Sequence, residues 1–221
     1  MISSRVLDFL RLLKENNNRE WFLSNKHLYN EAKNEFELFV EKLIIGTSLF
    51  DRDIGYLTIK DCTYRIHRDT RFSSDKTPYK INFGAYLVKG GKSSGNAGYY
   101  FHLEPNNSLI AGGVYMPVPE ILKKIRQSVF YNIEEFLEII NDNNFKRLFP
   151  ILDDDSVLKK YPLGFPKDFE YMEYLKYKSY TVSIPLKDEE VTSHEILGKT
   201  LKIFKILKPF NDFFNSAIEE G

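Results

Sequence analysis

The order of hydrophobic patterns along the chain is the feature that most constrains its fold. Apolar side chains recur at three- and four-residue spacing over residues 6–13, which is typical of one face of a helix. Residues 56–116 are instead rich in Tyr, Ile, Thr and Val, with Gly and Asn clusters between the runs, as in strands. Helical spacing returns after Pro117. Blocks of helices, strands and helices predict the α+β class.

The central region predicts a largely antiparallel sheet. Sequential strands with such short connections favour antiparallel pairing over parallel pairing, which requires a crossover. Pro105, Asn106 and Asn107 fit a hairpin turn, because Asn tolerates the left-handed backbone of such turns. A further strand is predicted near 178–184. The central strands are predicted at about 56–60, 62–68, 81–88, 97–103 and 107–116.

Helices are predicted to flank this sheet from both ends of the chain. Asn18 can cap a helix, and from Trp21 one apolar stripe predicts a long helix that ends near Gly46. Pro119 suits the first turn of a later helix, and Pro209 is expected to break the last one. The chain has neither an internal repeat nor a flexible linker, so residues 1–221 are predicted to form a single domain.

Charge and cysteine content indicate the compartment. The formal net charge is zero, which argues against non-specific binding of nucleic acid. A single cysteine, Cys62, fits a reducing cytosol. Arg5, Asp8 and Arg11 interrupt what would have to be the apolar part of a signal peptide, and no apolar run is long enough to span a membrane. We therefore expect a soluble, cytoplasmic protein that does not act on membranes.

A basic block between Arg65 and Lys80 is the strongest candidate for a functional site. Residues 60–92 hold eight Lys or Arg residues and three Asp residues. Guanidinium groups bind phosphate or carboxylate in a bidentate way, so the block fits an anion site. Asp69 and Asp75 lie within the block and can instead neutralise the arginines as a structural ion-pair network. Both interpretations stay open at the level of sequence.

The anion-site interpretation assigns a role to each residue. The ligand would be a phosphate-bearing small molecule or a nucleotide. If the site catalyses a reaction, Asp69 or Asp75 is the candidate general base, although neighbouring arginines favour the carboxylate and weaken it as a base. Arg65, Arg68, Arg71, Lys76 and Lys80 would supply charge, Ser73 and Tyr79 would orient the ligand, and Arg126, Lys176 and Lys178 would join from elsewhere in the fold.

The block also carries a family resemblance. Its residues Arg65, Arg68, Asp69, Arg71, Phe72, Ser73, Asp75, Lys76, Pro78, Tyr79, Lys80 and Asn82 resemble the most specific stretch of a bacterial and fungal family, domain of unknown function 2461. The resemblance covers most of the chain. It includes Asn18, Trp21, Phe22, Lys26 and Tyr29, then residues 112–115, Arg126, and residues 162–165 and 175–178. Ser74 stands where the family has a Lys, so this loop is one charge poorer. No activity or cofactor is established for the family, so the resemblance implies a fold and a block, without a reaction.

Two other motifs indicate no site. The run Gly90-Gly91-Lys92-Ser93 resembles a phosphate-binding P-loop, but Tyr86 stands where that motif needs Gly, and a strand is predicted to follow it where the motif has a helix. A hairpin tip is therefore expected. The histidines lack the short spacing of metal ligands, so no metal site is predicted.

Two other function classes compete with the anion site. In one, the block is architecture and the protein binds a protein partner. In the other, Tyr64, Phe72 and Tyr79 stack on nucleic-acid bases between the basic residues. Zero net charge and the two Asp residues inside the block count against nucleic acid.

Overall fold

A computed structural model describes residues 2–154 and 157–219 of the chain. Within these ranges, strands pair in an antiparallel sheet with the order β1-β2-β3-β4. The strands are β1 (Phe83–Leu87), β2 (Gly98–Leu103), β3 (Ser108–Val114) and β4 (Tyr180–Leu186). The predicted α+β class, with an antiparallel sheet flanked by N- and C-terminal helices, is confirmed.

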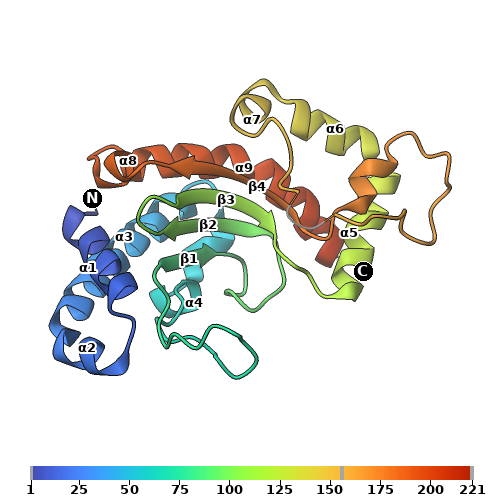
Figure 1. Ribbon diagram of the computed structural model, residues 1–221. Helices are drawn as coiled ribbons and strands as arrows, with labels where there is room; N and C mark the ends of the chain where they lie inside the picture. Colours follow the sequence, from blue (N-terminus) through green and yellow to red (C-terminus); the bar gives the residue numbers. More distant parts are fainter. Residues whose placement is uncertain (1, 155–156, 220–221) are drawn as a thin grey trace.

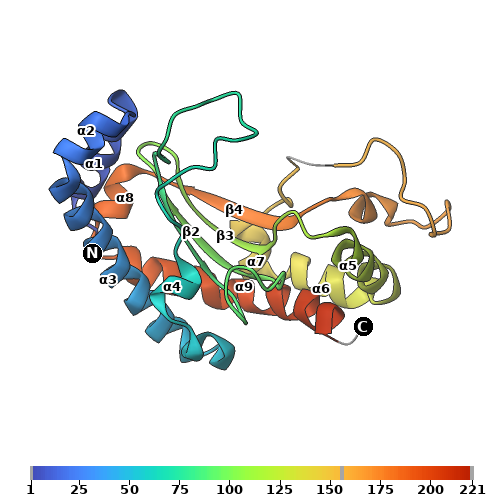
Figure 2. The ribbon, with the colours of Figure 1, turned by 90° about the horizontal axis from the view of Figure 1, so that it is seen from below.

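The helices gather on one side of the sheet. Figures 1 and 2 show α3 and α9 along one face, and no helix of the described chain covers the opposite face. The helices before β1 are α1 (Ser4–Glu15), α2 (Arg19–Ser24), α3 (Lys26–Ser48), the 3-10 helix η1 (Arg52–Tyr56) and α4 (Ile59–Cys62). Those after β3 are α5 (Pro119–Tyr131), α6 (Ile133–Asn141), α7 (Asn143–Leu148), η2 (Met172–Lys176), α8 (Asp188–Thr192) and α9 (Ile196–Glu219). None of the helices in the described ranges combines the length and apolarity needed to cross a membrane.

Alternation along the strands separates the two faces of the sheet. Ala85, Phe101 and Ile110 pair across β1, β2 and β3, and all three are fully buried on the helix-covered side. The neighbouring register pairs Tyr86 with Tyr100 and Tyr100 with Ala111, and these residues point to the other side, where they are only partly buried. We call this side the open face.

The C-terminal helix runs through a proline that was expected to break it. Pro209 lies inside α9, which continues to Glu219. Proline removes one helical hydrogen bond and disfavours the helix by about 3 kcal/mol. Phe210, Phe213 and Phe214 follow directly and are buried, and each buried aromatic contributes about 1.5–3 kcal/mol. Tertiary burial therefore outweighs the local preference.

The strands predicted at 56–60 and 62–68 are wrong. Residues 52–56 and 59–62 are short helices instead. Thr58 and Asp61 form a capping box, in which the Asp61 carboxylate accepts from the Thr58 backbone N–H at 2.7 Å, and this starts α4. The segment that follows keeps only isolated bridges, from Thr63 to Ala85 and from His67 to Tyr79.

The long N-terminal helix is divided in two, contrary to the single helix predicted from Trp21. Asn25 closes α2, since its backbone N–H donates to the Trp21 carbonyl, and α3 starts at the next residue. The cap at the start of α2 is confirmed, because the Asn18 side chain accepts a hydrogen bond from the Trp21 N–H at 2.9 Å.

Candidate functional site

The open face of the sheet bears a groove of about 620 Å³. Its floor comes from the strands and includes Tyr86, Tyr100, Ala111, Thr181 and Ser183. Its walls come from outside the sheet: Tyr64 after α4, four residues between β1 and β2 (Lys92, Ser93, Gly95 and Asn96), Tyr115 to Val118 between β3 and α5, and Asp153 after α7. Segments distant in sequence thus meet over the one sheet face that lacks a helix.

Tyrosine hydroxyls set the polarity of the groove floor. The Tyr86 hydroxyl lies 2.7 Å from the Asn96 carbonyl oxygen and 3.0 Å from that of Gly113, so it donates to these carbonyls. Burial raises the pKa of Tyr86, and burial followed by the charge of Tyr64 raises the pKa of Tyr100. These hydroxyls therefore stay protonated near neutral pH.

Cations lie at the rim of the groove. Lys92 lines it and donates a hydrogen bond to the Lys60 carbonyl. The Lys80 ammonium nitrogen lies 5.2 Å from the ring centroid of Tyr64, which is a groove wall. Burial and the nearby charge of Arg65 lower the pKa of Lys80. In the part of the chain that the structure describes, Lys80, Arg65 and Lys92 form no ion pair.

The rest of the basic block is a loop with its own ion pairs. Arg68 pairs with Asp75 and also donates to the Thr77 hydroxyl. Arg71 binds the Asp69 carboxylate through two nitrogens, at 3.0 and 2.7 Å. The Arg71–Asp69 pair is exposed, with side chains 77% and 46% accessible. The Arg68–Asp75 pair lies at the surface with Asp75 55% accessible and Arg68 half-buried at 26%. The structure therefore shows an ion-pair network on the surface rather than in the interior.

The two aspartates of this loop are poor bases. A hydrogen bond from the Thr77 backbone, together with those of Arg68 and the Thr77 side chain, lowers the pKa of Asp75 to about 2. Hydrogen bonds from Arg71 lower the pKa of Asp69. Both carboxylates are ionised near neutral pH, which weakens a general-base role for either one.

The end of the loop is anchored in the core. Tyr79 is 4% exposed, and its ring stacks on Phe22 with centroids 3.9 Å apart. Asn17 holds the Tyr79 backbone in both directions, donating to its carbonyl at 2.9 Å and accepting from its N–H at 3.1 Å. Lys76 is exposed and donates to the Thr70 carbonyl. Ser73 lies in the adjacent turn, where its N–H donates to the same carbonyl at 3.4 Å.

Three predicted site residues lie elsewhere. Arg126 on α5 donates to the Tyr177 carbonyl at 2.9 Å, and Lys176 pairs with Glu173 at 2.9 Å. Lys178 is exposed just before β4. Figures 1 and 2 place α5 and the segment before β4 at the opposite end of the sheet from the loop of residues 68–78. The structure does not bring these three residues together with the loop.

Exposed ion pairs lead to a stability prediction for the loop. Arg68→Ala and Arg71→Ala, made singly, should each leave the protein folded. The thermal midpoint should stay within about 4 °C of the wild type, because exposed pairs stabilise little. Circular dichroism melts measure this, with Arg5→Ala on the exposed side of α1 as the control. A collapse of folding in both loop variants would contradict the exposed arrangement.

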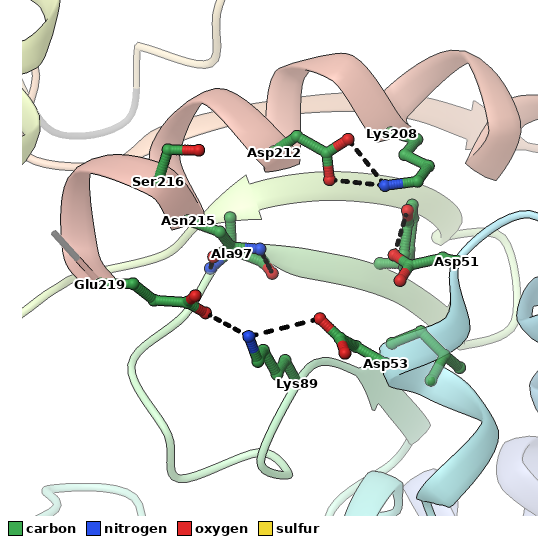
Figure 3. A pocket seen from close by; sticks show the side chains of 11 residues that line it. Asp51, Asp53, Lys89, Ala97, Lys208, Asp212, Asn215, Ser216 and Glu219 are labelled. Carbon is green, nitrogen blue, oxygen red and sulfur yellow. Dashed lines mark hydrogen bonds and ion pairs between the residues drawn. The ribbon is translucent and has the colours of Figure 1, made fainter.

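A second cavity of about 350 Å³ lies between η1, the β1–β2 connection and the end of α9. Its two lysines pair with three of its four carboxylates, as Figure 3 shows. The fourth, Asp51, accepts a hydrogen bond from the Tyr99 hydroxyl at 2.8 Å. Lys89 lies 2.7 Å from Glu219 and 3.4 Å from Asp53, and Lys208 lies 2.7 Å from Asp212. Within residues 2–154 and 157–219, no group of His, Cys, Asp and Glu side chains is placed to hold a metal ion. The contacts of Lys89 with Glu219 and of Ala97 with Asn215 in this cavity connect α9 to the segment between β1 and β2.

Sequence reasoning missed most of the groove. Its floor is made of small or aromatic residues that alternate with core residues on each strand, and such alternation predicts only a half-exposed sheet. One signal was available. Tyr86 on β1 and Tyr100 and His102 on β2 alternate with buried residues of their strands, which brings polar aromatic side chains to the face away from the core.

Comparison with known proteins identifies the family. The model of a family described as conserved hypothetical protein (DUF2461) matches residues 5–213. No curated protein and no solved structure matches the chain. The match covers the helices, the sheet, the groove and the basic loop together. The chain therefore belongs to the DUF2461 family of conserved hypothetical proteins.

Proposed function

We propose that the chain binds a phosphate-bearing small molecule, such as a nucleotide, in the groove on the open face. One observation carries this proposal: a groove of about 620 Å³ is lined by aromatic rings and by Lys92, and Lys80 lies against the ring of its wall residue Tyr64. Neither lysine forms an ion pair with described residues. Ligand sites commonly combine an apolar, aromatic lining with a few convergent polar groups.

Each part of the ligand has a matching part of the groove. The rings of Tyr64 and Tyr115 offer surfaces for a planar group such as a base. Lys92 lines the groove, and Lys80 and Arg65 lie next to Tyr64, so a phosphate at this end would offset charges that now repel one another. The loop of residues 68–78 adds the charges of Arg68, Arg71 and Lys76 to the positive field near the groove. Asp75 and Asp69 pair with the two arginines and neutralise part of this charge.

Ligand-induced stabilisation tests this proposal. A panel of nucleotides and sugar phosphates should contain at least one compound that raises the free energy of unfolding. At 100 times its dissociation constant, the expected rise is about 2.7 kcal/mol. Lys92→Gln and Lys80→Gln should each weaken binding about tenfold or more, because a hydrogen bond to a charged group contributes about 1.5–3 kcal/mol.

The matched control is Lys205→Gln, which removes an exposed lysine from α9 on the other side of the sheet. It should bind like the wild type. If no compound in the panel changes the melting temperature, the groove is not a phosphate-ligand site and the proposal fails.

A protein-binding module is the second candidate function. It is favoured by the paired arginines of the loop and by Phe72, which is 97% exposed near the loop tip. Nucleic-acid binding is less favoured, because Tyr79, one of its three stacking candidates, is buried against Phe22. A cytoplasmic location is part of the proposal, since phosphorylated metabolites and reduced cysteine coexist there.

A further inference from the structure

Three side chains of β2 and its C-terminal extension form a continuous hydrogen-bonded chain on the open face. Tyr100, His102 and Glu104 are spaced by two residues, so they point to the same side of the sheet. The Tyr100 hydroxyl lies 2.9 Å from His102 Nδ1, and His102 Nε2 lies 2.9 Å from the Glu104 carboxylate. Tyr100 lines the groove, and Glu104 lies at the β2–β3 turn.

The direction of the hydrogen bonds follows from the chemistry of the three groups. An ionised carboxylate only accepts, so His102 Nε2 carries the hydrogen that it donates to Glu104. The other nitrogen of a neutral imidazole is then an acceptor, and the Tyr100 hydroxyl donates to it. The Tyr100 oxygen keeps its lone pairs to accept a hydrogen bond.

The hydrogen-bonded chain is fixed at its Glu104 end. The Asn107 side chain donates to the Glu104 carboxylate at 3.2 Å, and the His102 and Glu104 side chains are 15% and 17% accessible. Besides burial, three titratable groups raise the pKa of Tyr100: Tyr64 in the groove wall, Glu104 on the same face of the sheet, and Tyr115 after β3. The Tyr100 hydroxyl therefore keeps its proton and can exchange it with His102 without forming a stable tyrosinate.

We propose that the hydrogen-bonded side chains of Tyr100, His102 and Glu104 form a proton relay that deprotonates a hydroxyl group of the molecule bound in the groove. The proposal rests on the proposed function, since the groove must hold the ligand. The ligand O–H bond breaks and its proton binds Tyr100 Oη, while the original Tyr100 proton moves to His102 Nδ1. The electron pair stays on the ligand oxygen, which attacks the phosphorus of a second phosphate ester while Glu104 stabilises the imidazolium. The P–O bond to the leaving oxygen of that ester breaks, and the leaving oxygen takes the proton back from His102 through Tyr100. Tyr100 is the catalytic residue, and His102 and Glu104 are positioning residues.

The test measures turnover and binding separately. Ribonucleoside 5′-phosphates and hexose phosphates are the probes, with conversion followed by mass spectrometry and ³¹P NMR and binding by thermal shift. We expect conversion of at least one probe. Tyr100→Phe and His102→Gln should lower the rate at least about 100-fold, the typical effect of losing acid–base catalysis, while the probe still binds. Tyr56→Phe and His194→Gln change exposed residues and are the controls.

The pH profile separates a relay from a structural network. In Glu104→Gln the carboxylate that stabilises the imidazolium is gone, so the rising limb of the rate should move to lower pH. Added imidazole should restore part of the rate in His102→Ala. Turnover that survives both Tyr100→Phe and His102→Gln would overturn the relay. Binding without turnover overturns the relay alone, and absence of both binding and turnover overturns the groove function as well.

Discussion

Gly113→Ala is expected to destabilise the protein by about 3–5 kcal/mol. Gly113 has φ of +111°, in a region that residues with a Cβ rarely adopt. A Cβ added there would lie 2.0 Å from the Tyr180 carbonyl oxygen and 3.1 Å from the Phe210 ring. Backbone strain and overpacking therefore act together at the point where β3, β4 and α9 meet. Urea unfolding followed by circular dichroism measures the loss.

A second glycine separates these two effects. Gly164 has φ of +92°, but an added Cβ would have nothing within 4 Å. Gly164→Ala should therefore show the strain alone, about 1–2 kcal/mol. Equal destabilisation by the two variants would contradict the close approach at Gly113.

Ala111→Phe is expected to abolish ligand-induced stabilisation while leaving the free protein folded. Ala111 lies on the groove floor between Tyr100 and Ser183, where a large ring would occupy the space proposed for the ligand. Phenylalanine favours strands and would fill an open groove, so the free energy of unfolding without ligand should change by less than about 1 kcal/mol. The loss with ligand should be the full stabilisation, about 2.7 kcal/mol at 100 times the dissociation constant.

Two control variants separate the effect of side-chain size at position 111 from the effect of adding a phenyl ring anywhere on the surface. Ala111→Ser keeps a small side chain at the same position and should retain binding. Ser24→Phe adds the same ring at an exposed site at the end of α2 and should also retain binding. Undiminished ligand stabilisation in Ala111→Phe would place the ligand outside the groove.

The sequence predicted the class and most of the sheet, because strand alternation and short turns are local signals. The strands at 83–87, 98–103, 108–114 and 180–186 lie close to their predicted ranges. Residues 56–62 misled the prediction because their composition suits a strand, whereas the Thr58 and Asp61 capping box starts a short helix. Pro209 misled it because the burial of three later phenylalanines depends on tertiary contacts.

The sequence predicted which charged residues gather near the candidate site, but it did not predict how they pair or that a groove lies beside them. Sequence located the cations of the block, including Lys80, which lies against the ring of the groove residue Tyr64. It did not show that Arg68 and Arg71 are already paired, because pairing depends on how a loop folds back on itself. The groove itself arises from segments as far apart as Tyr64 and Ser183, which meet only in the folded chain.

The most direct test of the groove as the binding site is a ¹H–¹⁵N NMR titration with the nucleotide or sugar phosphate that stabilises the protein most. The account predicts that the largest backbone shift changes occur at residues of the groove, such as Tyr100, Ala111 and Thr181. Residues of the cavity in Figure 3, such as Asn215 and Ser216, should change little. Shift changes confined to that cavity, or to the loop of residues 68–78, would contradict it.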